Sequence, residues 1–151
     1  MDQKRSASVH AAIACLQRLT DVFQQRRQQL ARSVGLSDQQ WAVLEEVSNE
    51  HFMPSMFAKS RESSAAAVSK ILRQLVDKGL IVASVDTTDA RQRRYELTTQ
   101  GKKTMLSLRK NRERAVKAIW MPLPANELDA FTRFGTRIME SMENYASTAA
   151  D

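Results

Sequence analysis

Cysteine, glycine and proline are all scarce in this chain of 151 residues, which has one Cys, four Gly and three Pro. Because Cys15 is alone, the sequence excludes an intramolecular disulfide and any zinc site built from several cysteines. The low content of Gly and Pro favours a mainly helical chain. No apolar run approaches the roughly 18 residues that a membrane span needs, and the N-terminus does not read as a signal peptide. We therefore expect a cytoplasmic protein with no membrane partner.

The residue patterns that carry catalysis are missing as well. The chain shows no carboxylate pair at a defined spacing, no Ser/His/Asp order and no glycine-rich phosphate loop. His10 and His51 are the only histidines, and neither has the acidic or histidine neighbours of a metal motif. The sequence therefore predicts a protein that is not an enzyme and that has no metal and no cofactor.

Positive charge is in excess and unevenly distributed. The 23 Lys and Arg residues outnumber the 17 Asp and Glu residues, which gives a net charge of +6. Residues 59–78 hold five basic and two acidic side chains, and residues 102–118 hold seven and one. A basic balance favours a polyanionic partner, which is either nucleic acid or an anionic membrane surface.

Residues 8–34 have the pattern of one long amphipathic helix that ends at Gly35. Its apolar residues recur at steps of three and four: Val9, Ile13, Leu16, Leu19, Phe23, Leu30 and Val34. A helix of about 25 residues spans roughly 40 Å, which is longer than a small core needs. The excess length predicts packing against a partner subunit.

A second helix is expected to begin after Ser37. Ser37 and Gln40 have the spacing of a capping box, and Leu36 and Trp41 occupy the two positions of a hydrophobic staple. This helix is expected to end near Asn49.

Two more helices follow along the chain. A short one is expected after Pro54, and Ser63 or Ser64 offers an N-cap for another over residues 65–78, which Gly79 ends. The stripe of this last helix that we expect to be buried is Val68, Ile71, Leu72 and Leu75. Its opposite face carries Ala66, Ser69, Lys70 and Arg73.

The period of the pattern then changes to two, which indicates a β-hairpin. Ile81, Ala83 and Val85 alternate on one strand, residues 87–92 form a polar tip, and Tyr95 and Leu97 alternate on the other strand. Thr98 is placed to cap a helix that enters at Gly101 and runs toward Trp120. Beyond Pro122 and Pro124, the last helix carries a seam close to period 3.5 with Leu128, Phe131, Phe134, Ile138, Met142 and Tyr145.

The expected fold is mainly α with a small β-hairpin wing (α+β). We predict one domain over residues 1–151, with a winged helix-turn-helix at 36–98 flanked by dimerisation helices at 8–34 and 101–147. The helix at 65–78 is the candidate for reading base edges, because Ala65, Ala66 and Ala67 add little bulk and polar side chains surround them. Taken alone, this helix is better explained as an ordinary amphipathic helix with a solvated basic face.

The hairpin tip favours the DNA-binding interpretation. It holds three arginines within four residues, Arg91, Arg93 and Arg94, and Asp89 is placed to hold Arg91 extended. A basic tip of this shape can reach a minor groove, whose negative potential attracts Arg. A basic helix followed directly by a basic hairpin seldom arises by chance.

These segments resemble the MarR family of bacterial transcription regulators. The wing resemblance rests on Leu80-Ile81, on Asp89-Ala90-Arg91 and on Leu97-Thr98-Thr99-Gln100-Gly101. Phe57-Ala58, Ser64, Val68-Ser69-Lys70, Leu75 and Lys78-Gly79-Leu80 are similar to the family's helix-turn-helix. One departure is the turn, which is usually apolar around a Gly and here is Arg61-Glu62-Ser63.

The resemblance implies a homodimer that binds double-stranded DNA at a pseudo-palindromic operator, as a ligand-responsive repressor. It assigns Ser64, Ala66, Ser69, Lys70 and Arg73 to the major groove and Arg91 to the minor groove, with Asp89, Arg93 and Arg94 beside it on the wing. It also implies a pocket for a small aromatic or anionic effector, for which the candidate residues are His10, Trp41, His51, Met53 and Met56.

Two alternatives stay open. One is a nonspecific architectural nucleic-acid-binding protein, which would share the charge but would not need a groove-reading helix. The other is a cysteine-based redox-sensing regulator, because some relatives sense peroxides through a cysteine on the first helix. In those relatives tyrosines assist the cysteine. The next tyrosine after Cys15 is Tyr95, on the wing, so this assistance is missing and we expect Cys15 to be a packed and inert thiol.

Overall fold

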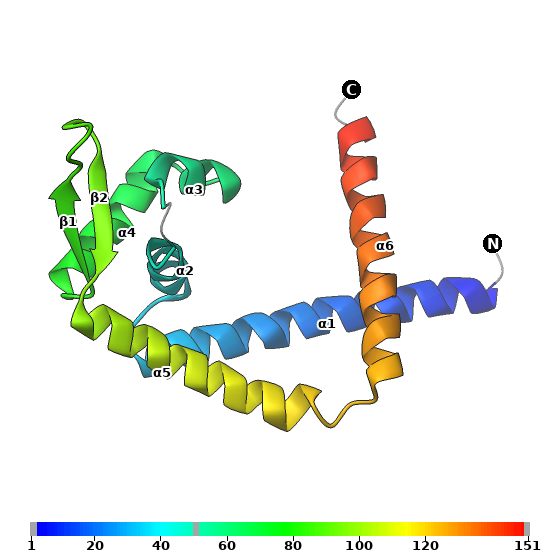
Figure 1. Cartoon of the computed structure of the whole chain (residues 1–151). Helices are drawn as coiled ribbons and strands as arrows, with labels where there is room; N and C mark the ends of the chain where they lie inside the picture. Colours follow the sequence, from blue (N-terminus) through cyan, green and yellow to red (C-terminus); the bar gives the residue numbers. More distant parts are fainter. Residues whose placement is uncertain (1–2, 50–51, 150–151) are drawn as a thin grey trace. The chain divides into compact units, whose positions relative to one another are not determined.

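The computed structural model describes residues 3–49 and 52–149, which are mainly helical with one two-stranded antiparallel hairpin. This confirms the predicted fold class. The chain divides into two compact units, residues 1–110 and 111–151. The elements are α1 (Gln3–Ser33), α2 (Asp38–Val47), α3 (Pro54–Ser60), α4 (Ala65–Asp77), β1 (Ile81–Val85), β2 (Arg93–Leu97), α5 (Thr99–Ala115), the π-helical turn η1 (Val116–Trp120) and α6 (Ala125–Ala149) (Figure 1).

Side-chain caps begin α2 and α4 where the sequence predicts them. At α2 the Gln40 backbone N–H donates to Ser37 Oγ at 3.0 Å, and the Ser37 N–H donates to Gln40 Oε1 at 3.0 Å. At α4 the Ala67 N–H donates to Ser64 Oγ at 3.1 Å. Each cap satisfies N–H groups that have no carbonyl partner within the helix, which sets the residue at which the helix begins.

Three helices end in the same hydrogen-bond pattern. At the end of α1, Leu36 N donates to Ala31 O and Gly35 N to Arg32 O. The ends of α4, at Gly79, and of α3, at Glu62, repeat this pair of bonds, which is that of the Schellman motif. The residue at the turn has a positive φ in each case: +75° at Gly35, +71° at Gly79 and +51° at Glu62.

The core of the first unit lies among α2, α4, the start of β1 and the C-terminal end of α1, with one residue each from α3 and α5. It consists of Ala31, Leu36, Trp41, Val43, Leu44, Val47, Ala58, Val68, Leu72, Leu75, Leu80, Ile81 and Leu108. The predicted stripe of α4 is buried at Val68, Leu72 and Leu75 and half-buried at Ile71. The Arg27 guanidinium lies 4.2 Å from the centre of the Trp41 ring and pairs with Asp38, which joins α1 to α2.

The hairpin pairs Ile81 with Leu97 and Val85 with Arg93. The alternating pattern predicts one buried face, and the structure differs on β1, where Ile81 is buried but Ala83 and Val85 are exposed. On β1 only the base of the hairpin is buried against the helices that form the core. On β2 the alternation is kept, because Tyr95 and Leu97 are half-buried and packed against the core while their neighbours are exposed.

The base of the hairpin is locked by hydrogen bonds around Thr98. Its backbone N–H donates to Leu80 O at 3.0 Å, and its hydroxyl donates to Gly79 O at 2.6 Å while accepting from Gly101 N at 3.0 Å. Gly101 is buried against the same carbonyl: a Cβ added to Gly101 would lie 2.0 Å from Leu80 O. The predicted cap at Thr98 is thus confirmed, although the helix begins at Thr99 and not at Gly101.

The second unit contains the end of α5, the turn η1 and α6. No residue of α6 is buried in the chain, and its apolar seam is exposed: Phe131, Phe134, Ile138, Met139, Met142 and Tyr145. Most of α1 is exposed in the same way, with Val9, Ile13, Leu16, Leu19, Val22 and Phe23 between 41% and 63% accessible. Among the described residues, α1 and α6 therefore each leave an apolar face exposed within their own unit.

Replacing Gly101 with Ala is expected to destabilise the protein by about 3 kcal/mol, because the added methyl would have to displace the backbone carbonyl of Leu80. The free energy of unfolding from urea denaturation measures this. Gly135→Ala is the matched control, since Gly135 lies within α6 with nothing within 4 Å of an added Cβ. There, removal of a helical glycine should stabilise by about 1 kcal/mol. Equal effects of the two substitutions would contradict the close packing of Gly101 against the Leu80 carbonyl.

Candidate nucleic-acid interface

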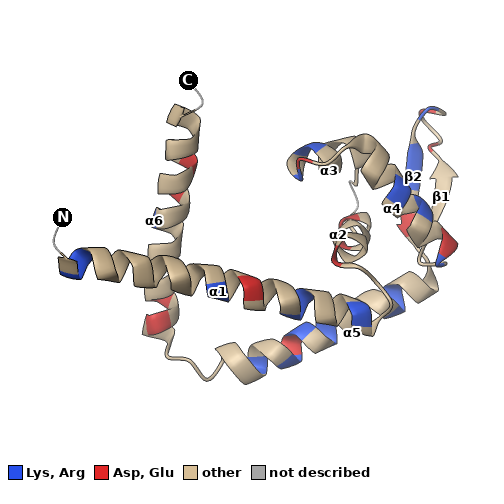
Figure 2. Ribbon diagram, turned by 180° about the vertical axis from the view of Figure 1, so that it is seen from behind, with Lys and Arg blue, Asp and Glu red and all other residues tan. Residues whose placement is uncertain are grey.

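Helix α4 presents a face of small and polar side chains to solvent. Ala66, Ser69, Lys70 and Arg73 are all exposed, on the side opposite to the buried residues Val68, Leu72 and Leu75. Figure 2 shows Lys and Arg on α4 and on the neighbouring strand β2. A helix of this kind can lie close to base edges, because its outer face has little bulk near the backbone.

The start of α4 is also suited to an anion. The first N–H groups of a helix have no intrahelical acceptor and carry a partial positive charge. Ser64 serves as the N-cap there, so its oxygen is engaged by Ala67 N, while its hydroxyl proton can still be donated outward. Ser64, which the sequence assigns to the major groove, thus also holds its own helix in place.

The turn before α4 is built from Arg61, Glu62 and Ser63. The Arg61 guanidinium lies 5.5 Å from the centre of the Phe57 ring. Glu62 adopts the left-handed conformation that Gly adopts at the ends of α1 and α4. The departure from an apolar, glycine-containing turn therefore preserves the backbone path and changes the side chains that the turn exposes.

The wing tip is shaped by two aspartates. Asp89 Oδ1 accepts a hydrogen bond from the Arg91 backbone N–H at 3.0 Å, and Asp86 Oδ1 accepts from Thr88 N at 2.8 Å and Thr88 Oγ1 at 2.7 Å. The bonds from Thr88, the backbone bond first, hold the pKa of Asp86 below its ordinary value. The sequence did not reveal the role of Asp86, although an aspartate two residues before a Thr is a common turn signal.

The arginines of the wing differ in what holds them. Asp89 was expected to hold Arg91 extended, and it does bond to Arg91, but through the backbone and not through the side chain. Within residues 3–49 and 52–149, no hydrogen bond or ion pair engages the Arg91 guanidinium. Arg94 Nε lies 3.4 Å from Glu96 Oε1, in a pair that is well exposed on both sides and so contributes little to stability.

Three aromatic rings tie the wing to the helix-turn-helix. Phe52 makes edge contacts with Phe57 of α3, with ring centres 6.0 Å apart, and with Tyr95 of β2, at 6.2 Å. Contacts of this kind fix relative orientation as well as burying surface. From the sequence, Phe57 was placed only in the helix-turn-helix and Tyr95 only on a strand, and no predicted role fell on Phe52.

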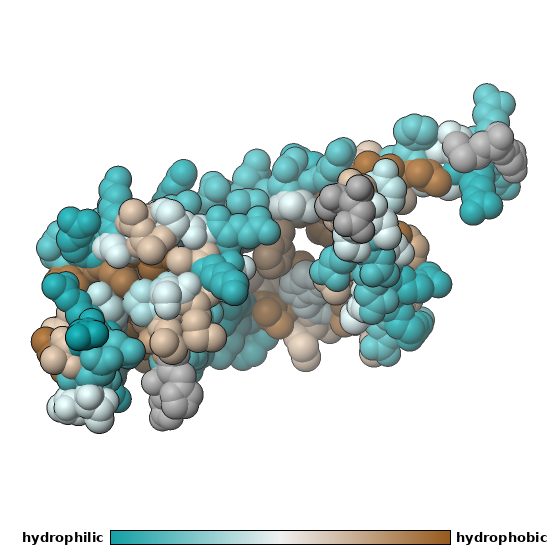
Figure 3. All heavy atoms as spheres, turned by 90° about the horizontal axis from the view of Figure 1, so that it is seen from above, coloured by the Kyte–Doolittle hydropathy of each residue, from teal (hydrophilic) through white to brown (hydrophobic). Residues whose placement is uncertain are grey.

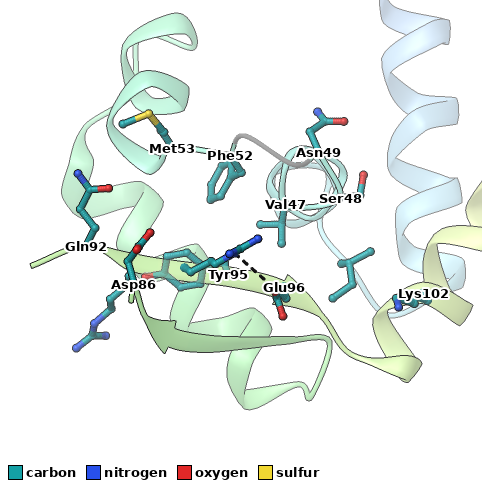
Figure 4. Close-up of a pocket in the computed structure, with 13 residues that line it drawn as sticks. Val47, Ser48, Asn49, Phe52, Met53, Asp86, Gln92, Tyr95, Glu96 and Lys102 are labelled. Atoms are coloured by element: carbon teal, nitrogen blue, oxygen red, sulfur yellow. Dashed lines mark ion pairs between the residues drawn. The ribbon is translucent and has the colours of Figure 1, made fainter. Parts of the chain in front are cut away.

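A cavity of about 910 Å³ lies beside this aromatic cluster, among the end of α2, the strand β2 and the start of α5 (Figure 4). Its wall combines Phe52 and Tyr95 with the cationic groups of Arg93, Arg94 and Lys102 and the carboxylates of Asp86 and Glu96. The other lining residues are Val47, Ser48, Asn49, Met53, Gln92 and Leu97. An aromatic surface beside several cations suits a ligand with a flat apolar body and a negative group.

The structure brings few of the predicted effector residues to this cavity. Met53 lines it, whereas Trp41 is packed in the core and Met56 is 65% exposed on α3. His10 lies on the exposed side of α1, where its Nδ1 is 2.7 Å from the carbonyl oxygen of Ser6. His51 lies outside the described residues.

Cys15 is exposed on α1. The expectation of a packed thiol is therefore wrong for this chain, because the face of α1 that carries Cys15 is not covered by other parts of the chain. Exposure alone does not make a thiol reactive, since reactivity needs a lowered thiol pKa or a cationic neighbour.

The described residues also contain neither a candidate metal site nor a candidate membrane span. Within residues 3–49 and 52–149, no three His, Cys, Asp or Glu side chains are grouped so that they could hold a metal ion. In the same part of the chain, no helix has the length and hydropathy to cross a membrane.

Comparisons with known proteins agree with this geometry. Residues 34–92 match the model of the MarR family. The crystal structure of the MarR family transcription regulator SP03579 superposes with a TM-score of 0.84 at 18% identity, covering 95% of this chain and 96% of that one. *Staphylococcus aureus* MepR, a transcription regulator of the multidrug efflux pump MepA, gives a TM-score of 0.70 at 20% identity over 85% of this chain and 96% of its own.

A crystal structure of the *S. aureus* MepR–DNA complex is also similar, with a TM-score of 0.68 at 20% identity, covering 85% of this chain and 94% of that one. No curated protein sequence matches this chain significantly. The match to the family model covers α2, α3, α4 and the hairpin up to its tip, and the structural matches extend over both units. Residues 34–92 therefore match the MarR family model, and the chain has the winged helix-turn-helix fold of solved MarR-family transcription regulators.

Proposed function

We propose that this protein is a transcription regulator that binds double-stranded DNA, with α4 in the major groove and the wing tip in the adjacent minor groove. The observation that carries the proposal is the presence, within one compact unit, of the small polar face of α4 and the unpaired Arg91 on a protruding hairpin. The similarity to a structure of MepR with DNA supports it.

The two elements would make different contributions to binding. In the major groove each base pair shows a distinct set of hydrogen-bond donors and acceptors, so Ser69, Lys70 and Arg73 would discriminate among bases. In the minor groove A·T and T·A look alike, so Arg91 would add affinity and a preference for A·T. Arg93 and Arg94 would strengthen the attraction to phosphate.

Replacing Arg91 with Ala is expected to weaken binding by about 1–3 kcal/mol per wing and to flatten its salt dependence, because one cationic contact is lost. Ser69→Ala and Arg73→Ala should instead relax the preference at particular base pairs. The measurement is a binding titration at several salt concentrations, with a duplex selected from a random pool, its single-base variants and a random duplex.

Arg109→Ala is the control, since Arg109 is an exposed arginine on α5 and should leave binding unchanged. The proposed docking is wrong if Arg91→Ala has the affinity and salt slope of the wild type. Equal affinity of the wild type for selected and random duplexes would favour the nonspecific architectural protein instead.

We further propose that the chain works as a homodimer. Helices α1 and α6 both expose apolar seams that a soluble protein rarely leaves uncovered. Figure 3 shows such hydrophobic surface on α1 toward its N-terminal end. A second copy of the chain would bury these seams. A two-fold axis would then present two α4 helices and two wings to a pseudo-palindromic site.

Deleting residues 124–151 is expected to produce aggregated or unfolded protein, because the dimer would lose the seam of α6. Ile138→Glu is a milder test, since it places a charge within that seam and should shift the mass measured by sedimentation equilibrium toward the monomer. Glu140→Lys on the same helix is the control. A truncated chain that stays folded, monomeric and able to bind DNA with full affinity would refute the dimer.

We propose that the regulator is a repressor that releases DNA when a small anionic aromatic molecule occupies the cavity beside Phe52. The cavity is lined by Arg93 and Arg94 of the wing. An anion held there would compete with DNA phosphate for the same guanidinium groups. Binding of the two ligands would then be antagonistic, as thermodynamic linkage requires.

Benzoate and ring-substituted benzoates, titrated against the complex with the selected duplex, are expected to raise the dissociation constant for DNA. Lys102→Ala should reduce this response severalfold without changing DNA affinity in the absence of benzoate, because Lys102 lines the cavity. Lys103→Ala is the matched control, since Lys103 is exposed next to Lys102 on α5 and does not line the cavity. The proposed site is wrong if both lysine variants respond as the wild type does.

A further inference from the structure

The turn that joins α3 to α4 contains an acidic residue at a position where the backbone favours glycine. The helices α1, α3 and α4 end in the same pair of hydrogen bonds, and the turn residue has a positive φ in all three. Gly35 and Gly79 occupy that position at the ends of α1 and α4, but Glu62 occupies it at the end of α3. A side chain with a Cβ is disfavoured in this conformation, whereas Gly adopts it freely.

No side-chain interaction in the described chain offsets the unfavourable backbone conformation of Glu62. No hydrogen bond or ion pair involves the Glu62 carboxylate within residues 3–49 and 52–149, and the residue is exposed. The bonds that close the turn are made by backbone atoms, Ser63 N to Ala58 O at 2.8 Å and Glu62 N to Lys59 O at 3.2 Å. Glycine in place of Glu62 would keep both of these bonds, so the fold does not require the carboxylate.

The carboxylate lies at the most electropositive end of α4. Glu62 is two residues before the N-cap Ser64 and is the only acidic residue from 54 to 76, a stretch that contains Lys59, Arg61, Lys70 and Arg73. In the proposed complex this end of α4 approaches the DNA backbone, because helix N-termini and basic side chains attract phosphate. A negative charge there opposes that attraction in any duplex, whatever its sequence.

We propose that Glu62 is an electrostatic brake on DNA binding, which lowers the affinity of each reading head for phosphate and so keeps the complex reversible. The inference rests on the proposed function, because it concerns the DNA-facing side of the same domain. The brake acts on the sequence-independent part of binding and leaves the base preference of α4 unchanged.

The test uses the full-length protein with Glu62→Gln, Glu62→Gly and Glu62→Asp, titrated with a selected duplex and a random duplex at several salt concentrations. Glu62→Gln removes the charge and keeps a side chain of the same size. It should tighten binding to both duplexes by about fivefold per half-site at low salt, and the gain should shrink as salt screens the charge. Glu62→Asp should bind as the wild type does.

Glu62→Gly separates the charge from the backbone strain. It should show the affinity gain of Glu62→Gln together with a higher thermal midpoint, whereas Glu62→Gln should leave the midpoint where it is. Glu127→Gln, in the second unit, is the control for net charge, because it removes one negative charge at a distance along the chain from the helix-turn-helix. It should leave the affinity for both duplexes unchanged.

The proposal is overturned if Glu62→Gln binds both duplexes as the wild type does. It is also overturned if Glu62→Gln weakens binding to the selected duplex alone, because the carboxylate would then be reading a base. A wild type that binds no duplex contradicts the proposed function itself, and this result differs from a wild type that binds DNA while the Gln variant shows no gain.

Discussion

The placement of the wing depends on a small set of backbone contacts where α4 ends and α5 begins. Thr98 bonds to the carbonyl oxygens of Gly79 and Leu80 and accepts from Gly101 N. Because β1 starts immediately after Leu80 and β2 ends immediately before Thr98, these bonds close the hairpin at its base. The close approach of Gly101 to Leu80 O leaves no room for a side chain, so the start of α5 is held to the end of α4.

The bonds around Thr98 and Gly101 also affect the direction of the wing, on which the proposed DNA recognition depends. The wing protrudes with most of its residues exposed, so its direction is set at the base and by the contacts of Phe52 with Phe57 and Tyr95. The same aromatic rings border the cavity that the wing arginines also line. A ligand there would touch the parts of the molecule that orient the wing, which is the physical basis of the proposed antagonism between the effector and DNA.

The proposed homodimer rests on the exposed apolar seams of α1 and α6. Amphipathic helices gain most of their stability by burying one face. The core of the first unit buries only the C-terminal end of α1, through Ala31, with Leu30 packed against it. Among the described residues, the rest of α1 and the whole of α6 leave their apolar faces exposed within their own units, which is why we propose a second copy.

Local interactions made much of the fold predictable from the sequence. Ser37, Ser64 and Thr98 cap their helices through bonds to residues three positions away, and Gly35 and Gly79 end theirs through a positive φ. Signals of this kind depend only on nearby residues, so they can be recognised from the sequence alone. The change of period at Ile81 also located the hairpin, and the opposite faces of α4 followed from helical spacing.

Contacts between distant residues could be decided only by the tertiary structure. The sequence grouped Trp41 with Met53 and Met56, yet Trp41 is packed under Arg27 in the core while Met53 lines a cavity beside β2. The alternation on both strands of the wing suggested one covered face, but Tyr95 and Leu97 of β2 are packed against the core while Ala83 and Val85 of β1 are exposed. Cys15 was expected to be packed, but the face of α1 that carries it has no partner within the chain. Periodicity shows which side of an element is apolar, and only the packing of elements far apart in the sequence determines what that side meets.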